Sequence, residues 1–469
     1  MSQPRIGIVG GGPGGLMTAY CLQSAAAVPY QLTILEASQR LGGKILTPRF
    51  TQYPHYYEAG AAEFYDYTPV GEDPLKELIL DLGLSIRAMY GGSLLRQGRL
   101  LGQLEAIEDE LGPEVSAGWR TFDRLAKDLM TPREFYEDDP RWLSGKASAE
   151  DRFSIWLGHN SSPKVRSLIE TLIHSDLATE PDQTGVAYGL QNYLMNDPAY
   201  MRLYSIEGGN EQLVSELAQR IEAKICLGQK VLGVETSSSG TLRVRSQSTG
   251  AGQDAEAERT HEFDYLVLAL PSGALKAIQF EPGSLAASLD AHQQRFHHPA
   301  HYLRITLLFS QIFWRELLPD AFCMLEAFGG CCLYDESARD PSAECGILGW
   351  LLGGKNAVEH GYLTDDALIE LALASLPEGL ADARRYLLEG RVHRWVGAVS
   401  AWPGGVPPIS LDARHQPAGS QHPNLLLVGD YLFDSTLNGV LDSAQYVAEW
   451  LAADLNVQAA EKVTATAAQ

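Results

Sequence analysis

The first forty residues contain the pattern that most constrains the fold. A short apolar, β-branched run, Arg5–Val9, ends in glycines, and Leu16–Ala27 then has the composition of a helix. Gln31–Leu35 is a second apolar run, and it closes at the acidic residue Glu36. This order predicts a βαβ unit, in which two parallel strands flank a crossover helix. The chain is therefore expected to begin with an α/β fold.

The glycines between the first strand and the helix follow the GxGxxG spacing. The first permits a tight turn, the second lets the backbone approach a pyrophosphate, and the third lets the helix pack on the strand. The amino end of the helix then directs partial positive charge at the phosphates. Glu36 lies where a carboxylate accepts from ribose hydroxyls. The pattern predicts a dinucleotide site but does not separate NAD from FAD; its glycines are Gly10, Gly12, Gly14 and Gly15.

Length and charge limit the remaining possibilities. The chain has 469 residues, enough for two or three packed units. It carries 36 Lys and Arg against 59 Asp and Glu, a net charge of -23. Nucleic acids and anionic membranes are bound by basic faces, so neither is an expected partner.

The sequence also bears on location. No apolar run approaches the ~20 residues of a membrane span, and the first residues lack the basic and apolar regions of a signal peptide. The six cysteines form no CxxC pair and no zinc spacing, which is typical of reduced thiols. His297, His298 and His301 cluster without a carboxylate at ligand spacing, so they are interpreted as solvated or capping side chains and no metal is expected. A cytoplasmic location is expected.

The spacing at which hydrophobic residues recur changes along the chain. Helical periodicity dominates residues 75–200. Within this range, Ser162-Pro163 predicts a helix cap followed by proline at the first helical position. A β pattern returns near Ser205. We therefore expect one domain that is built from separated stretches and interrupted twice. The nucleotide-binding domain would comprise residues 1–75, 205–275 and 391–455, the substrate domain residues 76–204 (mostly helical) and 276–390, and a flexible tail residues 456–469.

Further short blocks identify a family. They are Arg40–Lys44, the small-residue stretch Glu58–Glu63, Tyr204–Leu213, Val231, Asp264–Pro271, Phe313-Trp314 and Leu427–Ala444. With these blocks the chain resembles the flavin-containing amine oxidase family, whose fold relatives include protoporphyrinogen oxidase and the carotenoid desaturases. The resemblance implies an FAD-binding, Rossmann-like domain of the glutathione-reductase type with an inserted α+β substrate domain. Residues 76–200 and 315–390 match no motif.

The resemblance also implies particular FAD contacts. Glu36 would bind the adenosine ribose, the Val231 backbone would meet adenine, and Gly60–Ala62 would line the isoalloxazine. Asp430 would accept from the ribityl or pyrophosphate side, and the N–H of Val440 would donate to the flavin pyrimidine oxygen. The expected FAD-binding residues are Gly10, Gly12, Gly14, Gly15, Glu36, Ala37, Arg40, Gly43, Lys44, Gly60, Ala61, Ala62, Val231, Gly429, Asp430, Gly439 and Val440.

Two positions depart from the family pattern. Some relatives attach FAD through a cysteine about nine residues after a tryptophan, but Trp395 is followed at that distance by Gly404, so FAD is expected to be non-covalent. Many relatives carry a lysine near flavin N5, where this chain has Arg304. Either Arg304 is a fixed charge that stabilises reduced oxygen species, or it is an ordinary salt-bridged strand residue. Both interpretations stay open.

Substrate-contacting residues are harder to choose. Amine oxidases place the substrate nitrogen between aromatic rings, and the candidates are Trp395, Trp402, Tyr431 and Phe433, each of which could equally be core packing. Glu63 could meet a cationic group. With Arg304, the candidate catalytic residues are Trp395, Trp402, Tyr431 and Glu63.

The resemblance implies an enzyme that oxidises the C–N bond of an amine or amino acid by hydride transfer to flavin N5, with O2 as acceptor and imine and hydrogen peroxide as products. One alternative is a desaturase, protoporphyrinogen-type oxidase or isomerase that acts on C–C bonds, and a long apolar tunnel would favour it. An acidic pocket near Glu63 would favour an amine. A second alternative is a flavin-binding module without turnover. The expected partners are a small amine-type substrate and O2, and a homodimer stays open.

Overall fold

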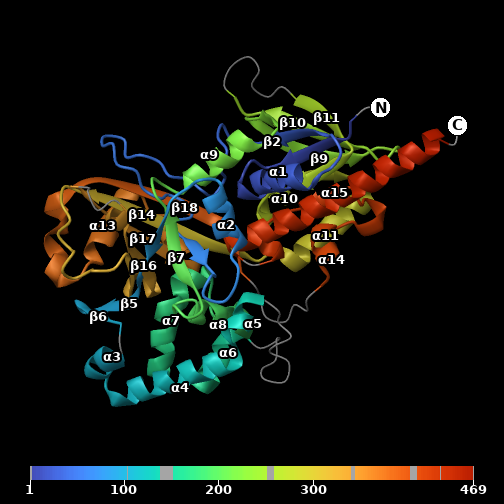
Figure 1. Ribbon diagram of the computed structural model, residues 1–469. Helices are drawn as coiled ribbons and strands as arrows, with labels where there is room; N and C mark the ends of the chain where they lie inside the picture. The colour runs from blue at the N-terminus through green and yellow to red at the C-terminus, as the bar shows by residue number, and fades with distance from the viewer. Residues whose placement is uncertain are drawn as a thin grey trace.

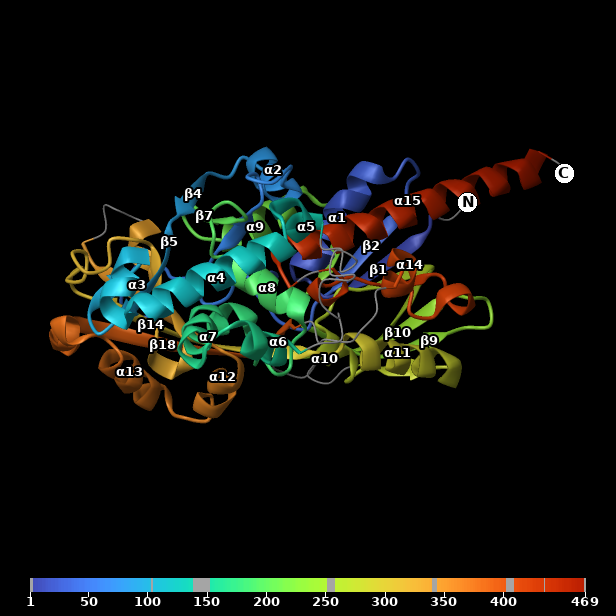
Figure 2. The same ribbon diagram turned by 90° about the horizontal axis from the view of Figure 1, so that it is seen from below.

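The protein consists of two lobes joined side by side. A computed structural model describes residues 3–102, 104–137, 152–250, 258–339, 344–401, 409–433 and 435–467. One lobe contains the amino-terminal sheet with helices α1 and α15, and both chain ends lie there (Figure 1). The other contains a larger sheet with helices on both faces, and the view from below separates the same two lobes (Figure 2). No helix in the described ranges is long and apolar enough to cross a membrane.

The predicted βαβ unit is confirmed. β1 pairs in parallel with β2 on one side and with β12 on the other, and the sheet order is β19-β12-β1-β2-β8. Helices α1 and α15 cover one face and a second sheet packs on the other, so Ile6, Ile8 and Ile34 are fully buried and the strands are apolar throughout. The bounds are β1 Arg5–Val9, α1 Pro13–Ala25, β2 Gln31–Leu35, β8 Lys224–Cys226, β12 Tyr265–Leu268 and β19 Leu425–Leu427.

The strand order reverses between β1 and β12. In an open parallel sheet, this is where a crevice forms beyond the carboxyl ends of the strands. Gly10 follows β1 and Glu36 follows β2, while Asp430 comes just after β19 at the same edge. The three segments that carry predicted FAD ligands are therefore brought together by the sheet.

The last helix, α15 (Leu437–Ala467), packs along α1. Leu441, Val447 and Leu451 are buried in the core that the two helices share with the sheet. The segment from residue 456 was expected to be a flexible tail, but it continues this helix to Ala467. Its residues are rich in alanine, which has the highest helix propensity.

A second sheet, β11-β10-β9-β13, packs on the face of the parallel sheet opposite α1 and α15, and it holds Val231 on β9. Its strands are β9 Gln229–Thr236, β10 Leu242–Ser248, β11 Glu258–Phe263 and β13 Gln279–Glu281. The nearby helices are α9 Glu211–Arg220, α10 Ser272–Leu275, α11 Gly283–Phe296 and α14 Leu411–His415.

A small antiparallel sheet, β3-β7-β4, connects the lobes. It comprises β3 Phe64–Asp66, β4 Ile86–Met89 and β7 Arg202–Ile206, and α2 (Pro74–Asp81) lies against it. Leu75 and Ile79 of α2 are buried in the core of the nucleotide-binding lobe. The boundary expected after residue 75 therefore falls inside a helix whose packing continues that lobe.

The second lobe is built on a mixed sheet in the order β18-β14-β17-β16-β15-β5-β6. α7 packs on one face and α13 on the other. α7 begins as predicted, since the Ser162 hydroxyl accepts from the N–H of Val165 at 3.4 Å and Pro163 is the first helical residue. The strands are β5 Gly91–Arg96, β6 Arg99–Leu101, β14 Pro299–Phe309, β15 Phe322–Leu325, β16 Cys331–Asp335, β17 Gly346–Gly353 and β18 Leu387–Ser400. The helices are α3 Leu104–Leu111, α4 Pro113–Leu129, α5 Pro132–Glu137, α6 Phe153–Asn160, α7 Pro163–Leu177, α8 Val186–Leu194, α12 Gly354–His360 and α13 Asp365–Ala374.

Candidate functional site

The glycine loop after β1 has the geometry of a phosphate-binding turn. Gly10 has a φ of 107°, and a Cβ there would overlap the carbonyl oxygen of Ala269. A Cβ on Gly15 would overlap the carbonyl oxygen of Gly10, so the helix approaches the strand only without a side chain. α1 follows at once, and its N-cap residue, Gly12, provides no side-chain hydrogen bond. The amino end of α1 is thus left to a ligand.

The acidic residue after β2 lies beside this loop. Glu36 accepts from the N–H of Gly11 at 2.7 Å with one carboxylate oxygen and from the N–H of Ser38 at 2.8 Å with the other. Ala37, next to it, accepts from the hydroxyl of Thr249 through its carbonyl. The carboxylate is therefore held near the phosphate loop, as a ribose ligand requires.

Arg40 and Lys44 have different surroundings. Arg40 donates to the carbonyls of Leu41 at 3.0 Å and Gly43 at 2.5 Å, so it stabilises its own loop. Lys44 donates to the Ala398 carbonyl and lies 3.3 Å from a carboxylate oxygen of Asp430. Lys44 thereby joins the loop after β2 to the turn after β19.

The other predicted ligands lie on the same side of the sheet. Gly43, with a φ of 53°, passes next to Gly12, and a Cβ on it would lie 3.2 Å from the Gly12 Cα. Gly429 donates its N–H to the hydroxyl of Ser443. The N–H of Val440 donates to the Thr436 carbonyl at 3.2 Å within the first turn of α15. The donation of this N–H to the flavin stays a prediction. The N–H would then have to be shared between the flavin and the Thr436 carbonyl.

Beyond these segments lies a cavity of about 150 Å³, which we term the flavin-facing cavity. Its lining includes the segment from Gly60 to Tyr65, Lys44 and the first residues of α15. From the second lobe it receives Tyr302 and Arg304 of β14, Leu351 of β17 and Trp395 of β18. Tyr302 and Trp395 are direct cross-strand partners, and the Trp395 indole donates to the Ala59 carbonyl at 2.6 Å. Two aromatic rings therefore face this cavity from one sheet.

The structure separates the predicted aromatic candidates. Trp395 lines the cavity, whereas Tyr431 is 2% exposed and packs with His292 and Phe296 in the core of the nucleotide-binding lobe. The prediction that Tyr431 meets substrate is wrong in this structure, because the short turn at Asp430–Leu432 directs its ring towards α11. Trp402 lies outside the described residues.

Arg304 is both buried and paired. It is 1% exposed, donates to Glu336 at 2.5 Å, and its guanidinium carbon lies 4.9 Å from the centre of the Tyr334 ring. Nε and Nη1 have no hydrogen-bond partner in the described part of the chain. Arg304 thus forms a buried ion pair and also lines the flavin-facing cavity, and its interpretation as a charge that stabilises reduced oxygen stays a prediction.

Glu63 lines the same cavity, and its two carboxyl oxygens differ in hydrogen bonding. One oxygen accepts from the Tyr334 hydroxyl at 2.9 Å, and the other has no partner among the described residues. Burial raises the pKa of this carboxyl, while the positive charge of Arg304 opposes the rise. Glu63 is therefore a buried acid with an oxygen available to a ligand.

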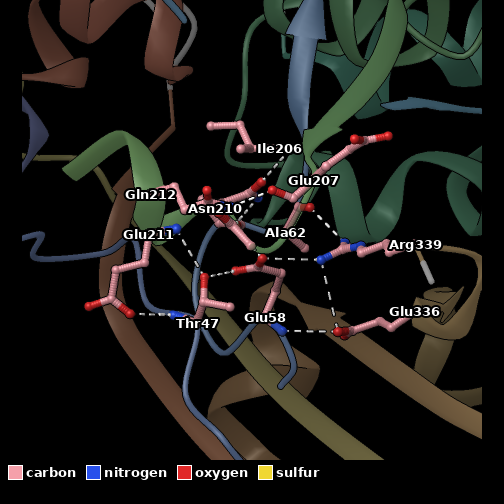
Figure 3. A network of polar contacts seen from close by, with 12 residues as sticks. Thr47, Glu58, Ala62, Ile206, Glu207, Asn210, Glu211, Gln212, Glu336 and Arg339 are labelled. Carbon is pink, nitrogen blue, oxygen red and sulfur yellow. Dashed lines mark hydrogen bonds and ion pairs between the residues drawn. The ribbon is translucent and has the colours of Figure 1, made fainter. Parts of the chain in front are cut away.

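A network of buried charges holds this region together (Figure 3). Arg339 donates to the Ala62 carbonyl at 2.7 Å and lies 3.4 Å from Glu58 and 3.9 Å from Glu336. Glu336 also accepts from the N–H of Glu58 at 2.9 Å. Burial raises the pKa of Glu336, but Arg304 and Arg339 outweigh it and the net pKa is lowered. Burial likewise raises the pKa of Glu58, to about 7.

The network reaches into the nucleotide-binding lobe. Glu58 accepts from the Thr47 hydroxyl at 2.8 Å and the Asn210 N–H at 2.9 Å, and the Asn210 side chain donates to the Ala61 carbonyl (Figure 3). Both carbonyls of the predicted flavin-lining pair, Ala61 and Ala62, are thereby fixed. Sequence reasoning missed Glu336 and Arg339, because nothing local marks them. It also missed Tyr302, although the two-residue alternation of a strand places it on the face of Arg304.

A second cavity, of about 290 Å³, adjoins the first, and we term it the outer cavity. Glu63 and Tyr65 line both. Asp176 and Asp320 also line the outer cavity. Asp176 accepts from the Asn196 amide at 3.1 Å, and burial raises its pKa to about 7. Among its described lining residues, the outer cavity therefore has three acidic side chains, Glu63, Asp176 and Asp320, against the basic Arg202.

The residues present fit FAD. The uncapped amino end of α1 and the close approach of Gly12 to Gly43 form a cradle for a pyrophosphate, and Glu36 lies beside it. Gly60–Ala62 line a cavity wall without large side chains. This donor set matches a dinucleotide that carries a flat ring system.

Comparisons with known proteins identify the family of the chain. The family model for flavin containing amine oxidoreductase matches residues 13–451. The chain is 22% identical over 410 residues to polyamine oxidase 4 of Oryza sativa subsp. japonica, which covers 84% of this chain and 76% of that protein. It is 25% identical over 348 residues to the L-amino-acid oxidase of Vipera ammodytes ammodytes, which covers 67% of this chain and 64% of that protein. The fold resembles cyclohexylamine oxidase from Brevibacterium oxydans IH-35A, with a TM-score of 0.70 and 19% identity, over 97% of this chain and 100% of that one.

Gly60→Ala is expected to abolish FAD retention. A Cβ there would overlap the Lys44 carbonyl oxygen, so the hydrogen-bonded segments that contain Lys44 and Ala61 must separate. The measurement is the ratio of flavin absorbance to protein absorbance after purification. Gly283→Ala is the matched control, because nothing lies within 4 Å of a Cβ at that position. Full flavin content in Gly60→Ala would contradict the assigned lining role.

Proposed function

The chain belongs to the family of flavin-containing amine oxidoreductases, FAD-dependent enzymes, and we propose that it oxidises the C–N bond of an amine. The observation that carries the choice of bond is the acidic lining beyond the flavin-facing cavity, to which Glu63, Asp176 and Asp320 contribute. A cationic amine is attracted there, whereas an apolar substrate of a C–C oxidase would have to desolvate carboxyl groups. FAD, held by the glycine loop, Glu36 and Gly60–Ala62, would supply the redox chemistry of amine oxidation, with O2 as the proposed final acceptor.

The side chains of the flavin-facing cavity have separate tasks in this proposal. Tyr302 and Trp395 hold the substrate between their rings and exclude water from the reacting carbon. Glu63 attracts the incoming ammonium with its unpartnered oxygen and takes a proton from it, because hydride leaves only from the neutral amine. The raised pKa of Glu63 makes it a better proton acceptor than an exposed carboxylate.

Anaerobic mixing with amines tests the proposed function. At least one member of a panel of primary amines, diamines and amino acids is expected to bleach the oxidised flavin band, and air should restore it with release of hydrogen peroxide. If the whole panel leaves the band unchanged, the proposed function is wrong and a binding module is favoured. If bleaching occurs and air does not restore it, O2 is not the acceptor.

Glu63→Gln is expected to lower kcat/KM for amines by about tenfold or more. A charge-assisted hydrogen bond contributes about 1.5–3 kcal/mol, and the amide neither attracts the ammonium nor takes its proton. The measurement is steady-state oxidation across pH, in which the acidic limb due to Glu63 should disappear. Glu316 is an exposed acid in the same lobe, and Glu316→Gln should leave both kcat/KM and the acidic limb of the pH profile unchanged. Equal kinetics in Glu63→Gln and wild type would exclude the assigned role.

Arg304→Gln separates the two interpretations of this residue. If Arg304 stabilises reduced oxygen, the rate at which air reoxidises the reduced enzyme falls by about tenfold or more, while anaerobic reduction by amine is unchanged. We expect this result, because Arg304 lines the flavin-facing cavity. A loss of thermal stability with equal reduction and reoxidation rates would instead mark a structural ion pair, since the buried Glu336 loses the nearer of its two arginine partners. Stopped-flow absorbance of the purified holoenzyme measures both rates.

A further inference from the structure

The outer cavity is rich in thioether sulfur. Four of the seven methionines in the chain line it, and they are Met89, Met195, Met201 and Met324. They come from β4, the end of α8, the residue before β7, and β15, so separate segments bring them together. Met17 and Met130 are fully buried and do not line this cavity, and Met1 lies outside the described residues. The thioethers are thus concentrated along one passage.

This wall adjoins the place where the bound flavin is proposed to react with O2. Glu63 and Tyr65 line both the flavin-facing cavity and the outer cavity. Tyr90, which also lines the outer cavity, is 69% exposed, so the outer cavity opens to solvent. A small neutral molecule that forms beside the flavin therefore has a route to solvent along the methionines.

The sulfur atoms of this wall differ in their reactivity towards a peroxide. Cys332 also lines the outer cavity, but burial raises the pKa of its thiol, and the negative charges of Asp176 and Glu63 raise it further. A thiol reacts as its thiolate, so Cys332 is held in its unreactive form. A thioether has no proton to lose and is oxidised in its ordinary state. The methionines, and not the cysteine, are therefore the reactive sulfurs of the passage.

The four methionines also differ in exposure. Met195 is partly exposed, whereas Met89 is 6%, Met201 4% and Met324 1% exposed. Susceptibility to oxidation follows exposure, so Met195 and Met89 are expected to react before Met324.

We propose that the outer cavity is a site of self-oxidation, at which Met195 and Met89 are converted to sulfoxides by the hydrogen peroxide that the enzyme itself produces. The thioether sulfur attacks one peroxide oxygen, an S–O bond forms as the O–O bond breaks, and the other oxygen leaves with both protons as water. Sulfur loses the two electrons that peroxide gains. The inference rests on the proposed function, because O2 must be the acceptor that yields the peroxide. A sulfoxide is polar, so each event makes an apolar wall of the passage more hydrophilic.

The test forms peroxide at the flavin without any amine. The wild-type holoenzyme is photoreduced with EDTA in the absence of oxygen and then reoxidised in air, over repeated cycles, with catalase in the solution to destroy peroxide that escapes. Peptide mass spectrometry then measures the sulfoxide fraction at each methionine. Met195 and Met89 are expected to exceed Met17 and Met130, the controls within the same molecule, by about tenfold or more. Illumination without air should give no sulfoxide.

A second arm tests access to the cavity apart from turnover. Hydrogen peroxide added in the dark to the resting holoenzyme should also oxidise Met195 and Met89 before Met17 and Met130, and should leave the Cys332 thiol unmodified. Oxidation of Cys332 in place of the methionines would overturn the proposal.

The other outcomes are distinct, and none needs a variant to fold. Equal sulfoxide fractions at all four of these methionines would overturn the proposal. If catalase abolishes the sulfoxides at Met195 and Met89, peroxide acts only from bulk solution, and the proposal is again overturned. If air reoxidation without catalase releases no peroxide, the acceptor in the proposed function and this inference are both wrong. If no amine bleaches the flavin and the cycles still oxidise Met195 and Met89, the oxidation of amines fails while the self-oxidation site stands.

Discussion

The buried network of Arg304, Glu336, Arg339 and Glu58 is the constraint on which the rest of the site depends. It joins β14 and the turn after β16 to the segment before Gly60, so each lobe supplies charges that the other neutralises. Removing one member of a buried pair leaves an uncompensated charge, which costs several kcal/mol. The carbonyls of Ala61 and Ala62, which are predicted to line the flavin, and the guanidinium of Arg304 are therefore positioned by one set of contacts.

The charges of this region do not balance. Among the described residues, the cations that lie near Glu58, Glu63 and Glu336 are the guanidiniums of Arg304 and Arg339. Glu336 lies nearest to both, and its pKa is lowered, whereas burial raises the pKa values of Glu58 and Glu63. Of these three acids, Glu63 is the one that lines the flavin-facing cavity. The excess negative charge is thus presented where an ammonium would arrive.

Sequence reasoning was sound for features that are contiguous in the chain and incomplete for those that are not. The strands Arg5–Val9 and Gln31–Leu35 have the predicted bounds, because apolar runs between turn residues specify buried parallel strands. Tyr431 was wrongly placed at the substrate, since a ring's direction depends on the turn that carries it. Glu336 was missed because it meets Arg304 from 32 positions away.

The sequence by itself determined the nucleotide-binding turn, because glycine spacing, helix start and terminal acid act through local backbone geometry. The tertiary structure alone decided the character of the outer cavity. Its acids and methionines include Met89 of β4, Asp176 of α7 and Met324 of β15, which no local pattern relates. The physical reason is that a phosphate loop is defined by the conformations of neighbouring residues, whereas a cavity wall is defined by which distant side chains pack together.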